Sequence, residues 1–266
     1  TLFRSWLYDI MKKSHTNLTQ GLNVSWDNRI NDPGNELRLW GQTDWTKDGK
    51  FILCYDYHDI WSISLDGKQR KRLTTGKEKN VRFRFDTSSI SNVEEFNYSN
   101  TGTLIYDLSK ELILTAFDLY SGARGYYQLQ PNKKPQALIV DYGMVTKYKK
   151  SKKGSAFVYV KQLFDLPPTV VFQNNGLSKI IVQSNAHQKK YHWGTSEMIH
   201  YTDSKGTPLK GALFYPANYD VTKKVPLIVY IYEVVSGDVH EYVNPSYDNN
   251  IGFNISNFTT NGYAVL

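Results

Sequence analysis

The stretch QTDWTKDGKFILCYDYHDIWSISLDGKQRKRLTT, residues 42–75, decides the fold of this chain. It begins with a polar turn that has Gly49 near its tip, and the turn leads into the apolar run Phe51-Ile-Leu-Cys-Tyr55. A second, alternating run at residues 60–65 ends in Asp66-Gly67, a pair that favours a hairpin because glycine adopts a positive φ at little cost. The pattern predicts strand, turn, strand, turn and strand.

The same stretch resembles the Trp-Ser-Pro-Asp-Gly, Ile-Trp, Asp-Gly, Leu-Thr repeat of TolB-like β-propeller blades and of the propellers in the prolyl oligopeptidase family. Thr46 and Lys47 stand where that repeat has Ser-Pro. Weaker strand patterns follow at a spacing that suits four-stranded blades, at residues 82–85, 103–107, 112–117, 125–129, 136–140, 156–160 and 169–172. We count about three blades, fewer than the four to eight of a closed ring.

The composition agrees with a mostly β chain. The 266 residues can hold one large or two ordinary domains, and 40% hydrophobic and 14% aromatic residues suffice for packed cores. Twenty Tyr and six Trp against three Met favour strands over helical bundles. No run approaches the roughly 18 apolar residues of a membrane span, and no signal peptide opens the chain. Because the chain begins without Met, we expect an earlier segment to be missing.

The net charge of +7 does not by itself predict a nucleic-acid partner. The basic residues gather at expected hairpin tips, at residues 67–72 and 147–153, where exposure to solvent explains them. No ladder of aromatic residues is interleaved with them, so we expect no nucleic-acid binding. The single cysteine, Cys54, lies inside an apolar run and is expected to be a small core residue.

The second informative region begins at residue 184. Its Trp193-Gly-Thr-Ser-Glu197 resembles the exit from the propeller in bacterial members of the prolyl oligopeptidase group. Two alternating runs, residues 198–202 and 209–215, then flank Asp203-Ser-Lys-Gly206, as in the antiparallel edge of an α/β-hydrolase sheet. We therefore expect the C-terminal part of a β-propeller at residues 1–195 and the truncated N-terminal part of an α/β-hydrolase domain at residues 196–266, with Trp193 buried at the junction.

The apolar run Leu227-Ile-Val-Tyr-Ile-Tyr232 predicts a strand buried on both faces. In the resembled family the matching strand ends in a Tyr whose hydroxyl donates to the tetrahedral oxyanion, and Tyr232 occupies that position. Such a donor contributes about 3 kcal/mol in the transition state. The following residues, Glu233-Val-Val-Ser-Gly237, are bulkier than the Gly-rich loop of many relatives. A Tyr that only packs at the strand end is the alternative.

The catalytic triad of a serine hydrolase is missing from these residues. That triad needs a Gly-x-Ser-x-Gly elbow followed by Asp and then His. The nearest match, Gly194-Thr-Ser196, lacks the second glycine and precedes the expected hydrolase sheet, so Ser196 is expected to be structural. Glu94-Glu95 are similar to the double Glu of dipeptidyl peptidases, but a solvated loop explains them better. No His-x-x-x-His or comparable ligand spacing occurs, so we expect no metal site and no cofactor.

These patterns predict a fragment of a bacterial serine peptidase of the prolyl oligopeptidase and dipeptidyl aminopeptidase type, acting on short peptides in the intact protein. The resemblance is strongest over residues 42–75 and 184–266. Tyr232 is its one candidate catalytic residue here, because the nucleophile, acid and base are absent, and the chain alone is expected to be inactive. A non-catalytic propeller that serves as a binding module is the alternative. The resemblance favours an exported or periplasmic protein, while substrate specificity and oligomeric state stay open.

Overall fold

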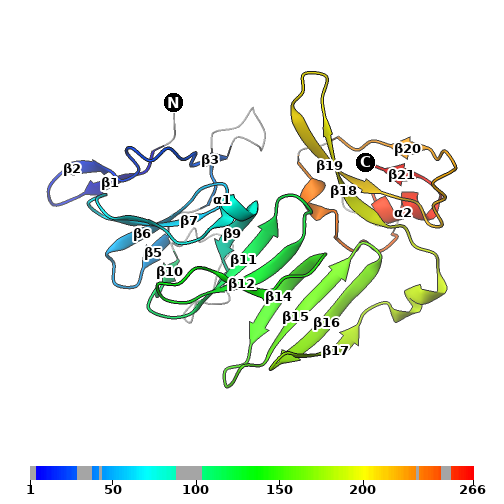
Figure 1. The fold of residues 1–266 in the computed structure, drawn as a ribbon, viewed down its shortest axis with the longest axis horizontal. Helices are drawn as coiled ribbons and strands as arrows, with labels where there is room; N and C mark the ends of the chain where they lie inside the picture. Colours follow the sequence, from blue (N-terminus) through cyan, green and yellow to red (C-terminus); the bar gives the residue numbers. More distant parts are fainter. Residues whose placement is uncertain (1–3, 29–37, 42–43, 88–103, 232–233, 247–252) are drawn as a thin grey trace. The chain divides into compact units, whose positions relative to one another are not determined.

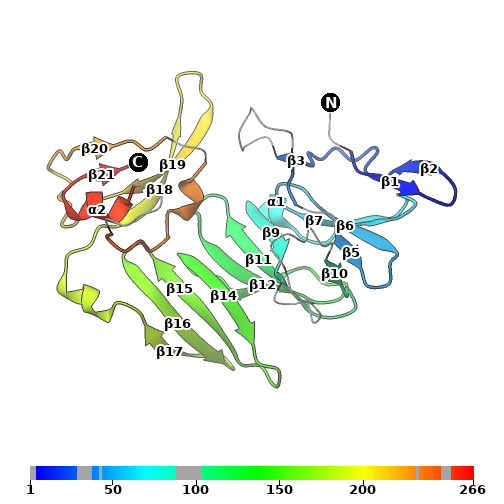
Figure 2. The same ribbon diagram turned by 180° about the vertical axis from the view of Figure 1, so that it is seen from behind.

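The computed structural model describes residues 4–28, 38–41, 44–87, 104–231, 234–246 and 253–266 (Figure 1). These residues are mostly strands arranged in several sheets, as Figures 1 and 2 show, and none of the described sheets closes on itself. The chain divides into two compact units. Unit 1 comprises Thr1–Asp118 and Tyr126–Val140, and unit 2 comprises Leu119–Gly125 and Asp141–Leu266. No helix among the described residues is long and apolar enough to cross a membrane.

The stretch that decides the fold forms four antiparallel strands of unit 1 in chain order. They are β5 (Asp44–Thr46), β6 (Phe51–Tyr55), β7 (Ile60–Ser64) and β8 (Arg70–Arg72), and β10 (Ile105–Tyr106) pairs in parallel with β5. Gly49 and Gly67 occupy the expected turn positions with φ of 65° and 69°, where other residues are strained. The predicted strands and both turns are confirmed.

The first hydrophobic core of unit 1 is formed by residues of these strands and of the N-terminal segment. That segment forms two short antiparallel pairs, β1 (Trp6–Asp9) with β2 (Ser14–Asn17), and β3 (Asp27–Asn28) with β4 (Arg38–Leu39). Trp26 and Leu18 pack there against Ile52, Cys54 and Ile63. Cys54 is buried in this core, as expected of a small core residue.

The second group of strands in unit 1 consists of β9 (Val81–Phe85), β11 (Leu112–Asp118), β12 (Arg124–Leu129) and β13 (Gln136–Ile139). Strand β9 alternates in burial, because Val81, Phe83 and Phe85 face the core while Arg82 and Arg84 lie on the other face. The Arg84 guanidinium donates to backbone carbonyls of residues 56 and 83. Burial lowers the pKa of Arg84 to about 10.

The buried carboxylate of Asp59 fixes the connection between these two groups of strands. It accepts hydrogen bonds from the Thr74 hydroxyl and from the backbone N–H of Gly76, the first residue of α1 (Gly76–Lys79). A Cβ atom at Gly76 would lie 2.3 Å from the carbonyl oxygen of Val81. Glycine is therefore required where α1 passes β9.

Unit 2 contains a third group of four antiparallel strands. They are β14 (Met144–Lys150), β15 (Phe157–Leu163), β16 (Leu166–Asn174) and β17 (Leu177–Gln183). Arg124, the first residue of β12, pairs in parallel with Met144. Residues 147–150 were expected in a hairpin tip, and instead they continue β14. The tip lies at residues 151–155, and Lys147 has a positive φ of 55° where the pairing of β14 with β15 is irregular.

A separate four-stranded sheet of unit 2 has the order β18 (Ser196–Thr202), β19 (Pro208–Phe214), β21 (Ala264–Val265) and β20 (Leu227–Ile228). Strand β19 is antiparallel to both of its neighbours, whereas β20 and β21 are parallel. The 3-10 helices η2 (Ala186–Lys190) and η3 (Ser236–Asp238) and the helix α2 (Ile255–Thr260) complete the unit. Its core consists of Phe164, Phe214 and Val265 with neighbouring aromatic residues.

The expectation that the run from Leu227 would be buried on both faces is wrong for the residues described. The exposed fractions of Leu227, Val229 and Ile231 are 52%, 53% and 88%. These residues alternate along β20 and the segment that follows it, and no described element covers their side chains. Tyr230 lies between them in the sequence and stacks on Phe253, with 4.5 Å between ring centroids. One face is packed and the other is open.

Candidate functional site

Tyr232, the predicted oxyanion donor, lies outside the described residues, and so do Glu94 and Glu95. The chain just before Tyr232 is well placed by backbone hydrogen bonds. Leu266 N–H donates to the Ile228 carbonyl at 2.9 Å, and Tyr230 N–H donates to the Leu266 carbonyl at 2.8 Å. Parallel pairing with the end of the chain therefore continues up to Tyr230, two residues before the predicted donor.

Ser196, the nearest match to a nucleophile, has its hydroxyl engaged. Its Oγ donates to the carbonyl oxygen of Val239 at 2.5 Å, which gives it a structural role. Among the described residues, no group of three or more His, Cys, Asp or Glu side chains could hold a metal ion.

Trp193 connects the β15–β16 turn to the segment that follows η3. Its Nε1 donates to the Phe164 carbonyl at 2.9 Å, and its ring stacks on Tyr242 with centroids 5.5 Å apart and planes 13° from parallel. The side chain is half-buried, whereas full burial was expected. Trp193 packs against the edge of the core formed by Phe164, Phe214 and Val265 and stacks on Tyr242, and part of its ring stays exposed.

Gly194 and Glu197 of the same motif both meet Tyr215. A Cβ atom at residue 194 would lie 2.1 Å from the Tyr215 carbonyl oxygen, so only glycine fits. The Tyr215 hydroxyl donates to the Glu197 carboxylate, and this hydrogen bond raises the pKa of Tyr215 to about 12. The motif residues therefore shape the entry into β18 and its contact with the end of β19.

The turn at residues 119–125 is held by side chains that lie far away in the sequence. Three consecutive backbone carbonyls of this turn each have a nitrogen of a different side chain within hydrogen-bonding distance. The pairs are Lys210 Nζ with the Leu119 oxygen at 3.1 Å, His200 Nε2 with the Tyr120 oxygen at 2.9 Å, and His240 Nε2 with the Ser121 oxygen at 2.9 Å. The turn between β11 and β12 is thereby fixed to β18, β19 and the residues after η3.

Two more contacts fix the same turn. Arg124 pairs with Asp238 at 2.7 Å across a partly exposed surface. Gly122 has a φ of 75°, and a Cβ atom there would lie 2.7 Å from Cγ1 of Val239. The sequence gives no signal of this arrangement, because its partners are separated by 80 to 119 residues.

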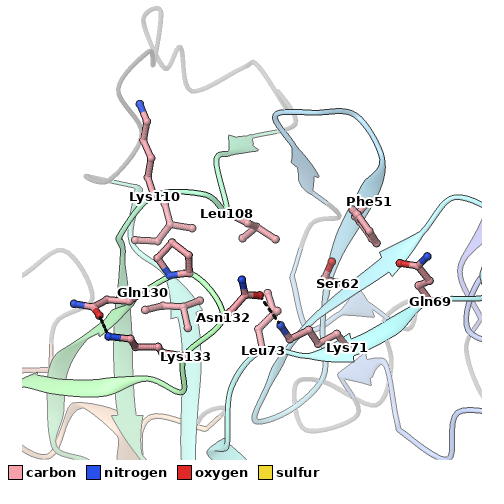
Figure 3. Close-up of a pocket in the computed structure, with 13 residues that line it drawn as sticks. Phe51, Ser62, Gln69, Lys71, Leu73, Leu108, Lys110, Gln130, Asn132 and Lys133 are labelled. Atoms are coloured by element: carbon pink, nitrogen blue, oxygen red, sulfur yellow. Dashed lines mark hydrogen bonds between the residues drawn. The ribbon is translucent and has the colours of Figure 1, made fainter.

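Unit 1 contains a cavity of about 240 Å³ (Figure 3). It lies between the β6–β8 strands on one side and the segment after β10 together with the end of β12 on the other. Its apolar lining consists of Phe51, Leu73, Leu108, Leu112, Leu129 and Pro131, and its polar lining of Ser62, Gln69, Lys71, Lys110, Gln130, Asn132 and Lys133. No carboxylate is among these lining residues.

Two of the three lysines at this cavity contact neutral oxygens. In Figure 3, the Lys71 side chain points toward Asn132, and its Nζ donates to Asn132 Oδ1 at 3.2 Å. Lys133 Nζ donates to Gln130 Oε1 at 2.8 Å. Lys71 belongs to the basic stretch that was interpreted as a solvated hairpin tip, so the sequence alone did not reveal the cavity.

Solved peptidase structures match 98% of this chain. The dipeptidyl peptidase 4 of Porphyromonas gingivalis matches with a TM-score of 0.53 at 11% identity, and a Bacteroides ovatus protein assigned as a dipeptidyl aminopeptidase IV with 0.52 at 15%. An isopeptidase solved with a bound astexin peptide matches with a TM-score of 0.50 at 12% identity. The chain shares the fold of these peptidases. The expected resemblance to the prolyl oligopeptidase family is thus confirmed at the level of the fold.

The matches also define how much of such a protein this chain represents. It spans 40%, 44% and 36% of the three chains named above. No family model and no curated protein matches the sequence.

Proposed function

We propose that this chain is part of a serine peptidase of the prolyl oligopeptidase type. The observation that carries the proposal is the strand order β18-β19-β21-β20, in which an antiparallel hairpin precedes a parallel β20–α2–β21 unit. An α/β-hydrolase sheet begins in this way. Its first two strands form an antiparallel edge, and its third strand in the chain lies outside the fourth in the sheet. Mixed sheets of this kind carry their sites at the carboxyl ends of the parallel strands.

The strands before β18 support a partial β-propeller that precedes that sheet in the sequence. Three groups of four successive strands, β5–β8, β9 with β11–β13, and β14–β17, have the arrangement expected of propeller blades. The division between propeller and hydrolase domains at residues 195 and 196 is part of this proposal. It falls where Trp193 and Gly194 make their contacts, immediately before β18.

In this proposal Tyr232 donates its hydroxyl to the oxyanion that forms when a serine attacks a peptide carbonyl. Its place in the sequence supports that role, because it follows Tyr230 at the carboxyl end of the β20–β21 pair. The nucleophile, base and acid come from the parent protein beyond these residues. The propeller then limits access to short peptides.

The proposal is tested with chromogenic dipeptidyl substrates that end in proline or in other residues. The parent protein should cleave members of this panel, and the 266-residue chain should give rates equal to buffer. A parent protein that is inactive on every substrate, yet binds peptides, would favour the binding module. Turnover by the 266-residue chain itself would contradict the proposed division of the catalytic residues.

A further inference from the structure

We propose that the cavity of unit 1 binds a small carboxylate that carries one apolar group. The cavity lies wholly within unit 1, so this inference does not depend on the proposed peptidase activity. Its walls come from two separate groups of strands, which meet around Leu73 and Leu129.

The charged residues at the cavity determine the sign of the charge that its ligand carries. Three lysines, Lys71, Lys110 and Lys133, border the cavity, and among the described residues no Asp or Glu lines it. Two of these ammonium groups contact amide oxygens, which accept a hydrogen bond but do not neutralise a charge. An anion at the rim would find complementary charge there.

Lys110, the lining lysine that lies near a carboxylate, is only weakly paired with it. Lys110 lies 4.0 Å from Asp107, and that carboxylate is also 3.6 Å from Lys47. A partly exposed pair at this distance holds its ammonium group loosely. The rim therefore keeps a net positive charge that an incoming carboxylate can use.

The apolar residues that line the cavity determine the size and polarity of the rest of the ligand. Leu112 and Leu129 are buried side chains that line the cavity, and the half-buried Leu73 packs against the same core cluster. The volume corresponds to about eight water molecules at roughly 30 Å³ each, and it lies below the roughly 300 to 1,000 Å³ of pockets for drug-sized ligands. Such a space accepts a single apolar side chain or a short acyl group.

The polar lining then fixes the orientation of the ligand. Ser62 and Asn132 both line the cavity, and the Asn132 amide oxygen accepts a hydrogen bond from the Lys71 ammonium group (Figure 3). A hydroxyl and an amide in such positions can donate to a carboxylate or accept from a neighbouring N–H. An N-acyl amino acid and the C-terminal residue of a peptide both have this chemistry.

The test is calorimetric titration of the 266-residue chain with N-acetyl-leucine, N-acetyl-leucinamide and the tripeptide Ala-Ala-Leu. N-acetyl-leucine should bind saturably, about tenfold or more tighter than the amide, and less tightly as salt is raised. Binding of the tripeptide at similar affinity would identify a peptide C-terminus as the source of the carboxylate. Binding of N-acetyl-leucine alone would identify a free small molecule.

Matched variants connect that binding to the cavity. Lys71→Gln should weaken N-acetyl-leucine binding about fivefold or more, because it removes one of the ammonium groups that border the cavity. Lys205→Gln makes the same change of charge in the exposed 203–206 turn and should leave the affinity unchanged. Equal binding of acid and amide, equal effects of the two variants, or the absence of saturable binding would overturn the proposal. Circular dichroism of both variants confirms that they are folded.

Discussion

The ring of His240 lies with Nε2 2.9 Å from the carbonyl oxygen of Ser121, although the two residues are 119 positions apart. Because a carbonyl only accepts, Nε2 carries the proton and donates it. The other ring nitrogen, Nδ1, is buried and has no hydrogen-bond partner among the residues that the structure describes, and the residue is 1% exposed. The neutral ring with its proton on Nε2 is therefore the form that fits this site.

The first prediction concerns pH. Burial lowers the pKa of His240, and the charge of Arg124 lowers it further, against the opposing effect of the hydrogen bond to Ser121. Below pH 6.5, the ordinary pKa of histidine being about 6.5, the His240 imidazole binds a proton in the unfolded chain but stays neutral in the folded chain. The contribution of His240 to stability is complete above pH 6.5 and is lost as the pH falls below it, by at most about 1.4 kcal/mol per pH unit.

Urea unfolding at several pH values between 7.5 and 5 measures this slope. His58 and Glu241 also have shifted pKa values, lowered and raised respectively by burial, so the wild type must be compared with a variant. His240→Gln keeps a donor for the Ser121 carbonyl and cannot titrate. Its stability should fall less steeply toward acid than that of the wild type. Identical slopes would contradict the assignment.

The second prediction concerns Gly194. A methyl group at this position would meet the Tyr215 carbonyl oxygen at 2.1 Å, so the backbone of β18 or β19 must shift. We expect Gly194→Ala to lower the free energy of unfolding by about 2 kcal/mol or more. Gly206→Ala is the control, since its φ of 80° makes alanine strained while the space around it is open. That variant should cost only about 1 kcal/mol, and an equal or larger loss there would contradict the steric explanation.

The third prediction compares two leucines of β-strands. Leu114 in β11 is 0% exposed and belongs to the main core of unit 1, whereas Leu177 in β17 is 78% exposed. Leu114→Ala should reduce the free energy of unfolding by about 2 to 5 kcal/mol, because it removes buried surface and leaves a cavity. Leu177→Ala should change it by no more than about 0.5 kcal/mol. Denaturant unfolding of both variants checks the difference, which similar losses would rule out.

The parts of the fold that follow from local chemistry could be predicted from the sequence. Strands β6 and β7 form where apolar alternation predicts them, and Gly49 and Gly67 turn the chain between strands. Strand β14 was missed because its lysines suggested a loop, although Met144, Val145 and Tyr148 of that strand are buried. A lysine can lie on the solvent face of a strand as well as in a turn, so composition alone does not separate them.

The site depended on contacts that no local pattern encodes. His200 and His240 lie in no recognisable motif of the sequence, and both contact carbonyls of the 119–125 turn. The run from Leu227 to Tyr232 was expected to be buried on both faces, because its residues are apolar throughout. Burial depends on what packs over a strand, and the described elements cover only the face that carries Tyr230. The role of Tyr232 stays a prediction.

The fourth prediction tests that role in the parent protein. Tyr232→Phe removes one hydroxyl and little volume, so it should lower kcat by about 10² or more with little change in KM, because the lost interaction belongs to the transition state. Tyr230→Phe is the matched control, since Tyr230 stacks on Phe253 and the ring is retained. It should leave kcat unchanged. An unchanged kcat in Tyr232→Phe would mean that Tyr232 only packs at the end of the strand.

The most direct test of the peptidase assignment is labelling with a serine-directed fluorophosphonate, followed by mapping of the modified peptide. In the parent protein we expect one labelled serine, located after residue 266 in a Gly-x-Ser-x-Gly sequence. The 266-residue chain should take up no label, because the hydroxyl of Ser196 is engaged by the Val239 carbonyl and no nucleophile elbow occurs in its sequence. Specific labelling of a serine within residues 1–266, or no labelled serine in the parent protein, would contradict the account.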